Sequence, residues 1–126
     1  MYNLIIGYNK SSINLINYLI ARGKVIFLID CKDSEEIQIK SNSFYYYKVD
    51  ITDMKQVLDK ASKSMLSKVF IVTEDDYLNL MIEEALKELK NVHAVYDARA
   101  LERLSANGSK NFFIQDFFQD LDKGED

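Results

Sequence analysis

Short apolar runs alternate with segments of helical periodicity along the whole chain, and this alternation constrains the fold more than any other feature. The apolar runs predict six strands, at residues 3–7, 24–30, 43–50, 68–72, 92–97 and 111–116. Helical spacing predicts helices at 11–22, 53–62, 76–90 and 98–108, and a weak, short helix at 34–42. Strands and helices in strict turn favour a parallel sheet with right-handed crossovers. The expected fold is therefore α/β, a doubly wound Rossmann-like six-stranded sheet in the order 3-2-1-4-5-6.

The ends of these elements carry their own signals. Ser11 or Ser12 can cap the first helix, and Gly23 is placed to end it. The expected strand order puts the first strand at the centre of the sheet and the third at an edge. Because 126 residues suffice for one ordinary domain, we expect a single domain over residues 1–115 and an acidic tail over 116–126.

The composition excludes several classes of partner. The formal net charge is −4, so the chain has no basic footprint for nucleic acid. It holds no run of 18 apolar residues that could insert into a membrane, and its first residues predict no signal peptide. Cys31 is the single cysteine, which permits no internal disulfide and fits a reducing, cytoplasmic location.

The first turn carries the sequence IIGYNKSS, where a dinucleotide-binding protein has G-x-G-x-x-G. Gly7 keeps the first glycine, which permits the tight turn, while Asn9 and Ser12 replace the second and third. Asparagine tolerates a positive φ better than most residues, but its side chain would stand where a pyrophosphate lies. Lys10, Ser11 and the free N–H groups of the helix start can still attract an anion. We therefore expect weak or absent dinucleotide binding.

Asp30 ends the second predicted strand, 23 residues after Gly7. An acidic residue roughly 20 residues beyond the glycine loop accepts hydrogen bonds from the ribose hydroxyls of NAD and disfavours a 2′-phosphate. Asp30 can equally be a simple cap for the loop that follows its strand. The sequence leaves both interpretations open.

Four stretches of the chain together resemble one family. They are NLIIGYNKSSINLINYLIARGKVIFLID, YYKVDITDMKQVL, VFIVTEDDYLNLMIEEALKEL and AVYDARALERL. In order and spacing they resemble the regulator-of-potassium-conductance (RCK) N-lobe, also called the TrkA N-terminal (TrkA-N) domain, with a degenerate glycine-rich loop. The resemblance implies a cytoplasmic sensor that binds NAD, NADH, ATP, ADP or AMP, forms homodimers and regulates a membrane potassium channel or transporter subunit. Val49 departs from the family, which has a glycine before the residue that matches Asp50.

The same resemblance implies which residues would line a ligand site. The first turn would contact the phosphates, the end of the second strand the ribose, and the turn after the third strand the base. The loop after the fourth strand would form the floor, and an arginine after the fifth could pair with a phosphate or with an acidic neighbour. In this order the residues are Gly7, Tyr8, Asn9, Lys10, Ser11 and Ser12, then Asp30, Cys31 and Lys32, then Asp50 and Ile51, then Thr73, Glu74 and Asp75, and finally Arg99.

Other residues suggest weaker candidates. The acidic run 74–76 could supply oxygen ligands to a divalent cation, but acidic residues also favour the first turn of a helix, which we prefer. His93 has no cysteine or second histidine to share a metal, so we expect a structural role. Cys31 is expected to be a packed cysteine rather than a reactive thiol. No nucleophile and base stand together in a recognisable motif, so we expect no enzymatic activity.

These observations predict a regulatory nucleotide-sensing module of a potassium channel or transporter system, with weakened nucleotide binding or no ligand at all. Two alternatives stay open: a small NAD-dependent oxidoreductase domain, and a ligand-free Rossmann scaffold that acts only through protein partners. We also expect self-association, because the predicted helix 76–90 carries an apolar strip and because Phe117 and Leu121 share one face of a helical tail. The alternative is that this tail folds back on the chain's own core. In the resembled family, a helix at that place crosses to the partner domain.

Overall fold

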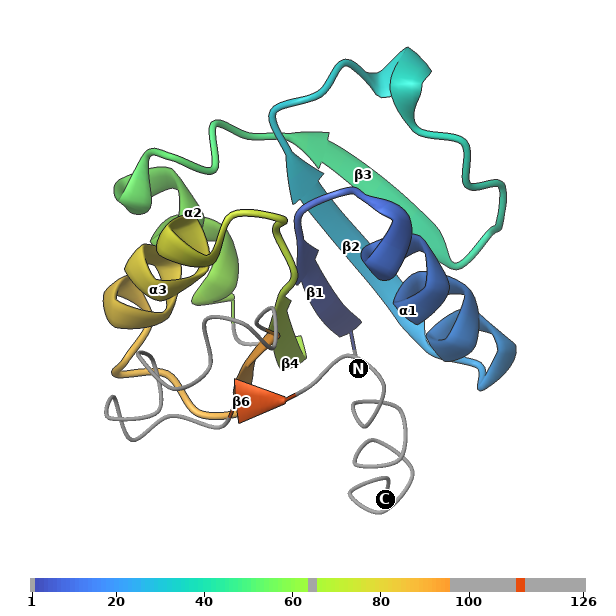
Figure 1. The fold of residues 1–126 in the computed structure, drawn as a ribbon. Coiled ribbons are helices and arrows are strands. Elements are labelled where there is room, and N and C mark those ends of the chain that lie inside the picture. Colours follow the sequence, from blue (N-terminus) through green and yellow to red (C-terminus); the bar gives the residue numbers. More distant parts are fainter. Residues whose placement is uncertain (1, 64–65, 96–110, 113–126) are drawn as a thin grey trace.

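A computed structural model describes residues 2–63, 66–95 and 111–112, and it confirms the expected sheet (Figure 1). All strand pairs are parallel, and the strand order is β3-β2-β1-β4-β5-β6. β1 is therefore central and β3 lies at an edge, as the alternation of strands and helices predicts. The strands are β1 (Tyr2–Ile6), β2 (Val25–Asp30), β3 (Phe44–Lys48), β4 (Leu66–Ile71), β5 (Val92–Val95) and β6 (Asn111–Phe112).

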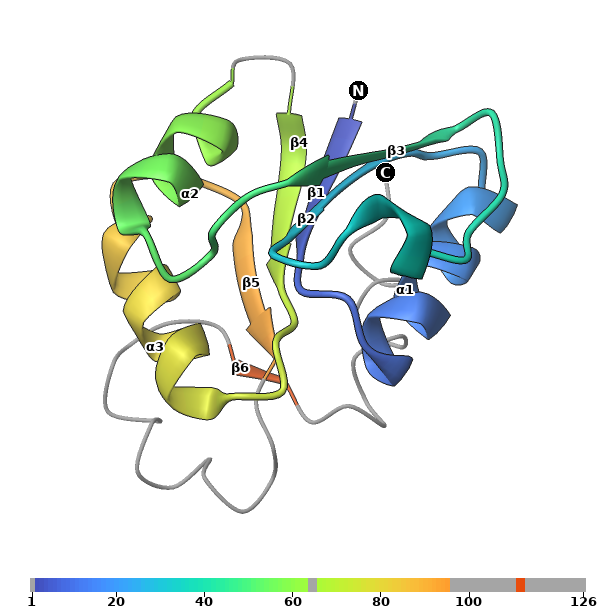
Figure 2. The ribbon, with the colours of Figure 1, turned by 90° about the horizontal axis from the view of Figure 1, so that it is seen from above.

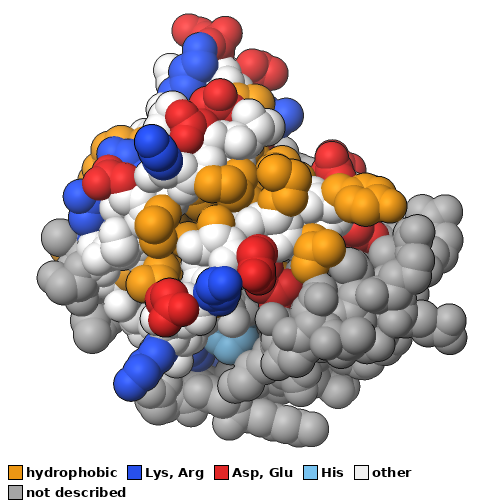
Figure 3. All heavy atoms as spheres, turned by 90° about the vertical axis from the view of Figure 1, so that its left-hand side faces the viewer, with side chains coloured by type: hydrophobic (Ala, Val, Ile, Leu, Met, Phe, Trp, Pro, Cys, Tyr) orange, Lys and Arg blue, Asp and Glu red, His pale blue; other side chains and the backbone are white. Residues whose placement is uncertain are grey.

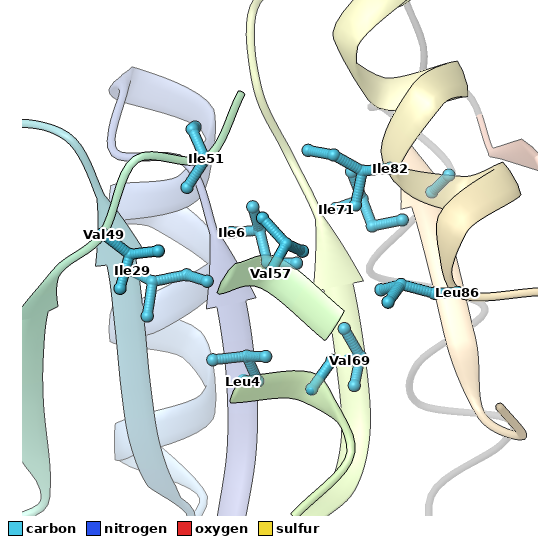
Figure 4. Close-up of a cluster of buried hydrophobic side chains, with 12 residues drawn as sticks. Leu4, Ile6, Ile29, Val49, Ile51, Val57, Val69, Ile71, Ile82 and Leu86 are labelled. Carbon is cyan, nitrogen blue, oxygen red and sulfur yellow. The ribbon is translucent and has the colours of Figure 1, made fainter. Parts of the chain in front are cut away.

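Helices cover both faces of the sheet (Figure 2). One face packs on α1 (Lys10–Ala21), whose Leu15, Ile16 and Leu19 join Phe70 in a buried cluster. The other face packs on α2 (Met54–Ala61) and α3 (Asp76–Ala85). Figure 4 shows this second cluster, with side chains of both helices over the strands: Leu4, Ile6, Ile29, Val69 and Ile71 from the sheet, and Val57, Ile82 and Leu86 from α2, α3 and the turn after it. The chain after β1 and the chain after β4 therefore leave the sheet toward opposite faces.

α1 begins one residue earlier than the sequence suggests, at Lys10. Its N-cap is Asn9, not Ser11 or Ser12, so that expectation is wrong. The apolar pattern starts only at Ile13, which concealed the first helical residues. Gly23 does end the helix: with φ at +78°, it lets its own N–H bond the Ile20 carbonyl and the next N–H bond that of Leu19. This pair of bonds satisfies the last free carbonyls of the helix.

Two predicted helices are shorter than expected. Of residues 34–42, only Ser34–Glu36 are helical, and they form a single 3₁₀ turn. Ile37 and Ile39 alternate as in an extended chain, because both pack against the buried cluster between α1 and the sheet. The predicted helix 76–90 ends at Ala85, after which the main-chain bonds shorten to the i to i−3 pattern of turns. The predicted helix 98–108, Arg99 and the tail with Phe117 and Leu121 lie outside the described residues.

Apolar side chains are exposed on the side of the molecule that α2 and α3 cover (Figure 3). Among the described residues, the large exposed apolar side chains all belong to α2, α3 or β3. Tyr45 and Tyr47 on β3 contact Phe27 edge-on on this side of the sheet. The set, which we call the exposed α2–α3 face, is Tyr45, Tyr47, Leu58, Tyr77 and Met81. No described helix is long and apolar enough to cross a membrane.

Candidate functional site

The turn after β1 lies tightly against the end of β4. Gly7 has a φ of +108°, which residues with a side chain rarely adopt. A Cβ atom at this position would lie 2.8 Å from the Val72 carbonyl oxygen and 3.0 Å from the Thr73 Cα. Gly7 is therefore required both for its backbone conformation and for the close approach of two loops.

Asn9 and Ser12 close the start of α1 through a reciprocal pair of bonds. The Ser12 N–H donates to Asn9 Oδ1 at 3.0 Å, and the Asn9 N–H donates to Ser12 Oγ at 2.8 Å. Ser12 is fully buried, so the position of the third glycine serves packing and capping together. Asn9 has a φ of −158°, so its tolerance of positive φ, which we expected to matter, is not used.

The Asn9 side chain also reaches the neighbouring strand. Its Nδ2 donates to the Val72 carbonyl oxygen, just beyond β4, at 2.6 Å. Only one orientation of the amide satisfies both contacts, because Val72 offers an acceptor and the Ser12 N–H a donor. The Lys10 and Ser11 N–H groups make no hydrogen bond within the part of the chain that the structure describes. These two amides are the donors that the helix start still offers to an anion.

Asp30 lies directly beside this turn at the end of β2. Its side chain is 6% exposed and accepts hydrogen bonds from the Tyr8 N–H and the Cys31 N–H, each at 2.6 Å. The carboxylate thus caps two loops, which fits the simpler interpretation of Asp30. A carboxylate has about four acceptor positions, so these two bonds and a third from the Cys31 thiol still leave capacity for a ligand hydroxyl. The ribose interpretation therefore stays a prediction.

Tyr46 supports the loop after β2, although it was not among the predicted site residues. Its hydroxyl donates to the Asp30 carbonyl oxygen at 2.8 Å and also contacts the Lys32 carbonyl oxygen. Burial of the phenol and the nearby Asp30 charge raise the pKa of Tyr46 from 10.0 to about 12, so the hydroxyl stays a donor at neutral pH. Because tyrosine is common in strands whatever its hydroxyl contacts, the sequence did not indicate this role.

The loop between β4 and α3 is held by Asn79, which was also not among the predicted site residues. Asn79 is fully buried, and its Oδ1 accepts from the Thr73 N–H at 3.0 Å and from Thr73 Oγ1 at 2.5 Å. Its Nδ2 donates to the Thr73 carbonyl oxygen at 3.1 Å. Asp75 caps α3 by accepting from the N–H groups of Tyr77 and Leu78, which confirms the helix-start interpretation of residues 74–76. In the sequence, the only indication of this role was the presence of an asparagine six residues after Thr73.

The remaining predicted site residues are less closely connected. Asp50 folds its own turn by accepting from the Thr52 N–H and hydroxyl, and the next residue, Ile51, is buried in the α2–α3 cluster. Val49 links this turn to the site, because its N–H donates to the Asp30 carbonyl oxygen at 2.8 Å. Glu74 and Lys10 are exposed, and both lie beyond the carboxyl ends of the strands, after β4 and β1 respectively. Within the described ranges, no group of three residues is arranged to hold a metal ion.

Cys31 is exposed, which contradicts the expectation of a packed cysteine. Partial burial of its sulfur and a hydrogen bond to the Asp30 carboxylate raise the pKa of the Cys31 thiol. The thiol therefore stays protonated at neutral pH, and the thiolate is the form that reacts. The neighbouring Asp33 pairs with Lys48 at 2.6 Å, and this contact raises the pKa of the exposed Lys48.

Residues 3–113 match the model of the TrkA-N domain family. No curated protein sequence matches the chain. Among solved structures, the NAD(P)-binding domain of an exopolyphosphatase-related protein from Archaeoglobus fulgidus is 22% identical, with a TM-score of 0.67. The match covers 98% of this chain and 95% of that one.

Two similar structures are of the protein GsuK. Its RCK domain is 20% identical with a TM-score of 0.67, over 87% of this chain and 24% of that one. The GsuK channel bound to NAD is 17% identical with a TM-score of 0.64, over 87% and 21%. UDP-glucose 4-epimerase is 17% identical with a TM-score of 0.57, over 78% and 36%. This chain therefore spans less than half the length of most of these relatives, and the likeness shows a shared fold.

Proposed function

This chain belongs to the TrkA-N domain family, and we propose that it is a regulatory module that binds a nucleotide at the carboxyl ends of β1, β2 and β4. One observation carries the proposal. A buried carboxylate, Asp30, lies at the end of β2 and bonds the first turn, which leads into the two free N–H groups at the start of α1. In open α/β sheets, ligands bind where neighbouring strands send the chain to opposite faces, and β1 and β4 are such a pair.

Each part of the ligand would have a chemical partner in this arrangement. The Lys10 and Ser11 N–H groups, with the exposed Lys10 ammonium, would bind a phosphate. Asp30 would accept from ribose hydroxyls with its remaining lone pairs. A 2′-phosphate would bring its charge against the same carboxylate, which should exclude such ligands.

The regulatory part of the proposal rests on family membership and on the relatives. GsuK is described as a channel, with an RCK domain and with bound NAD. We infer that this chain acts on the cytoplasmic side of a potassium channel or transporter, where ligand binding favours one arrangement of paired domains. The ligand would be NAD, NADH or an adenine nucleotide. The alternative is an enzyme domain like that of the epimerase, and detectable hydride transfer to or from the bound nucleotide would favour it.

The first prediction concerns Asp30. Calorimetry of the whole chain with AMP, ADP, ATP, NAD and NADH should detect binding of at least one nucleotide. Asp30→Asn should weaken that binding at least ~10-fold, because a hydrogen bond to a charged group contributes about 1.5–3 kcal/mol. Adenosine 2′,5′-bisphosphate should bind more weakly than AMP.

Asp59→Asn is the matched control, because it removes the same charge from an exposed position in the second half of α2. It should leave the affinity unchanged. A folded Asp30→Asn variant that binds like the original chain would contradict the ribose role. If no nucleotide binds at millimolar concentration, the result would favour the alternative hypothesis of a ligand-free Rossmann scaffold.

The second prediction concerns self-association. We propose that the exposed α2–α3 face contacts a second copy. Burying a fully exposed methionine contributes about 1.5–3 kcal/mol, so burying Met81, which is 54% exposed, should contribute about 1–1.5 kcal/mol. Light scattering should show a dimer that Met81→Glu weakens at least ~10-fold. Asn14→Glu adds the same charge to an exposed position of α1, on the other face, and should have no effect. A chain that stays monomeric at high micromolar concentration would refute dimerisation. A chain truncated after Gln115 that still dimerises would show that the interface lies outside the tail.

A further inference from the structure

The Asn9 side chain joins the start of α1 to the end of β4. Its amide accepts from the Ser12 N–H and donates to the Val72 carbonyl oxygen at 2.6 Å. Val72 in turn donates its N–H to the Ile6 carbonyl oxygen at 2.9 Å, which fixes its position beside β1. The bridge therefore spans the two strands whose chains leave toward opposite faces of the sheet.

This position matters for a ligand that extends past the start of α1. A dinucleotide at such a site runs across the point where the strand order reverses, with its pyrophosphate over the helix start. The second glycine of the fingerprint leaves room for the backbone to approach that pyrophosphate. Here a side chain takes that room, and it is held by two hydrogen bonds rather than free to turn away.

The donors that remain at the helix start are also few. The Asn9 and Ser12 N–H groups are both used within the capping pair. The Lys10 and Ser11 N–H groups remain, and they are adjacent in the chain. Two neighbouring amides suit the oxygens of one phosphoryl group better than the two groups of a pyrophosphate.

We propose that Asn9 is a specificity-determining residue that restricts the site to a nucleoside monophosphate and excludes dinucleotides. This inference rests on the proposed function, because it concerns the same site. The nucleoside would lie on the β2 side, beside Asp30, with its single phosphate on the Lys10 and Ser11 amides. The Asn9 bridge to Val72 closes the path toward the β4 side, where the second nucleoside of NAD would have to pass.

The test compares AMP and NAD on the whole chain and on two variants. The original chain should bind AMP at least ~10-fold more tightly than NAD. Asn9→Ser keeps an N-cap acceptor but is too short to reach Val72, and Asn9→Gly costs only a few tenths of a kcal/mol as an N-cap. In both variants, the preference for AMP over NAD should fall at least ~10-fold, while the affinity for AMP changes less than threefold. Thermal unfolding would check that the variants are folded.

The outcomes separate this inference from the function on which it rests. An original chain that binds NAD as tightly as AMP would overturn the role of Asn9 and leave nucleotide binding intact. An unchanged preference in both folded variants would also overturn it. A chain that binds ADP or ATP but not AMP would also overturn the role of Asn9 and leave nucleotide binding intact. A chain that binds none of AMP, ADP, ATP, NAD and NADH would overturn the proposed function, and the inference with it.

Discussion

Replacing Gly7 by alanine is expected to lower the free energy of unfolding by about 2–6 kcal/mol. Two costs add: about 1–3 kcal/mol for a side chain at a φ of +108°, and about 1–3 kcal/mol for overpacking. The new Cβ atom would meet the Val72 carbonyl oxygen at 2.8 Å, and main-chain atoms cannot turn aside as a flexible side chain can. Because whole domains are stable by only about 5–15 kcal/mol, urea unfolding should show a large fall in the midpoint.

Gly23→Ala is the control that separates the two costs. Gly23 also has a positive φ, +78°, but nothing lies within 4 Å of the Cβ position. Its replacement should therefore cost only the conformational part, about 1–2 kcal/mol. If the two variants lose the same free energy of unfolding, the close approach of the Gly7 turn to the end of β4 would contribute nothing to the requirement for glycine at position 7.

Replacing Asn79 by alanine is expected to lower the free energy of unfolding by about 2–4 kcal/mol. The substitution leaves the Thr73 N–H and carbonyl oxygen without their partner, and an unsatisfied buried polar group costs about 1–3 kcal/mol. Since Thr73 is half-buried, water can reach part of the gap, and this keeps the expected loss below the maximum. The Thr73 amide should also exchange its hydrogen faster, because its acceptor is gone.

Asn14→Ala provides the comparison. Asn14 is exposed on α1, where alanine is the better helix former, so this variant should be neutral or up to about 0.7 kcal/mol more stable. A loss at Asn79 no larger than the change at Asn14 would show that Asn79 does not hold the loop between β4 and α3. The Asn9 partner, Val72, begins that loop, so a confirmed loss would tie loop stability to the proposed nucleotide site.

The sequence by itself determined the fold, because the alternation of elements is a property of neighbouring residues. Apolar runs such as 24–30 are typical of strands buried on both faces of a sheet, and the helical spacing between them favours crossover helices. Local chemistry also placed the Gly23 stop and the acidic start of α3. It failed at residues 34–42, where Ile37 and Ile39 pack as an extended chain on a cluster that only the fold creates.

The site was determined by the sequence only in part. The sequence identified Gly7, Asn9, Ser12 and Asp30 by their place in a degenerate motif, but not what each side chain contacts. Tertiary structure decided that Asn9 turns toward Val72, 63 residues away, and that Tyr46 supports the Asp30 loop. The physical reason is that a polar side chain bonds whichever donor or acceptor the fold brings within about 3 Å, and such neighbours are distant in the sequence.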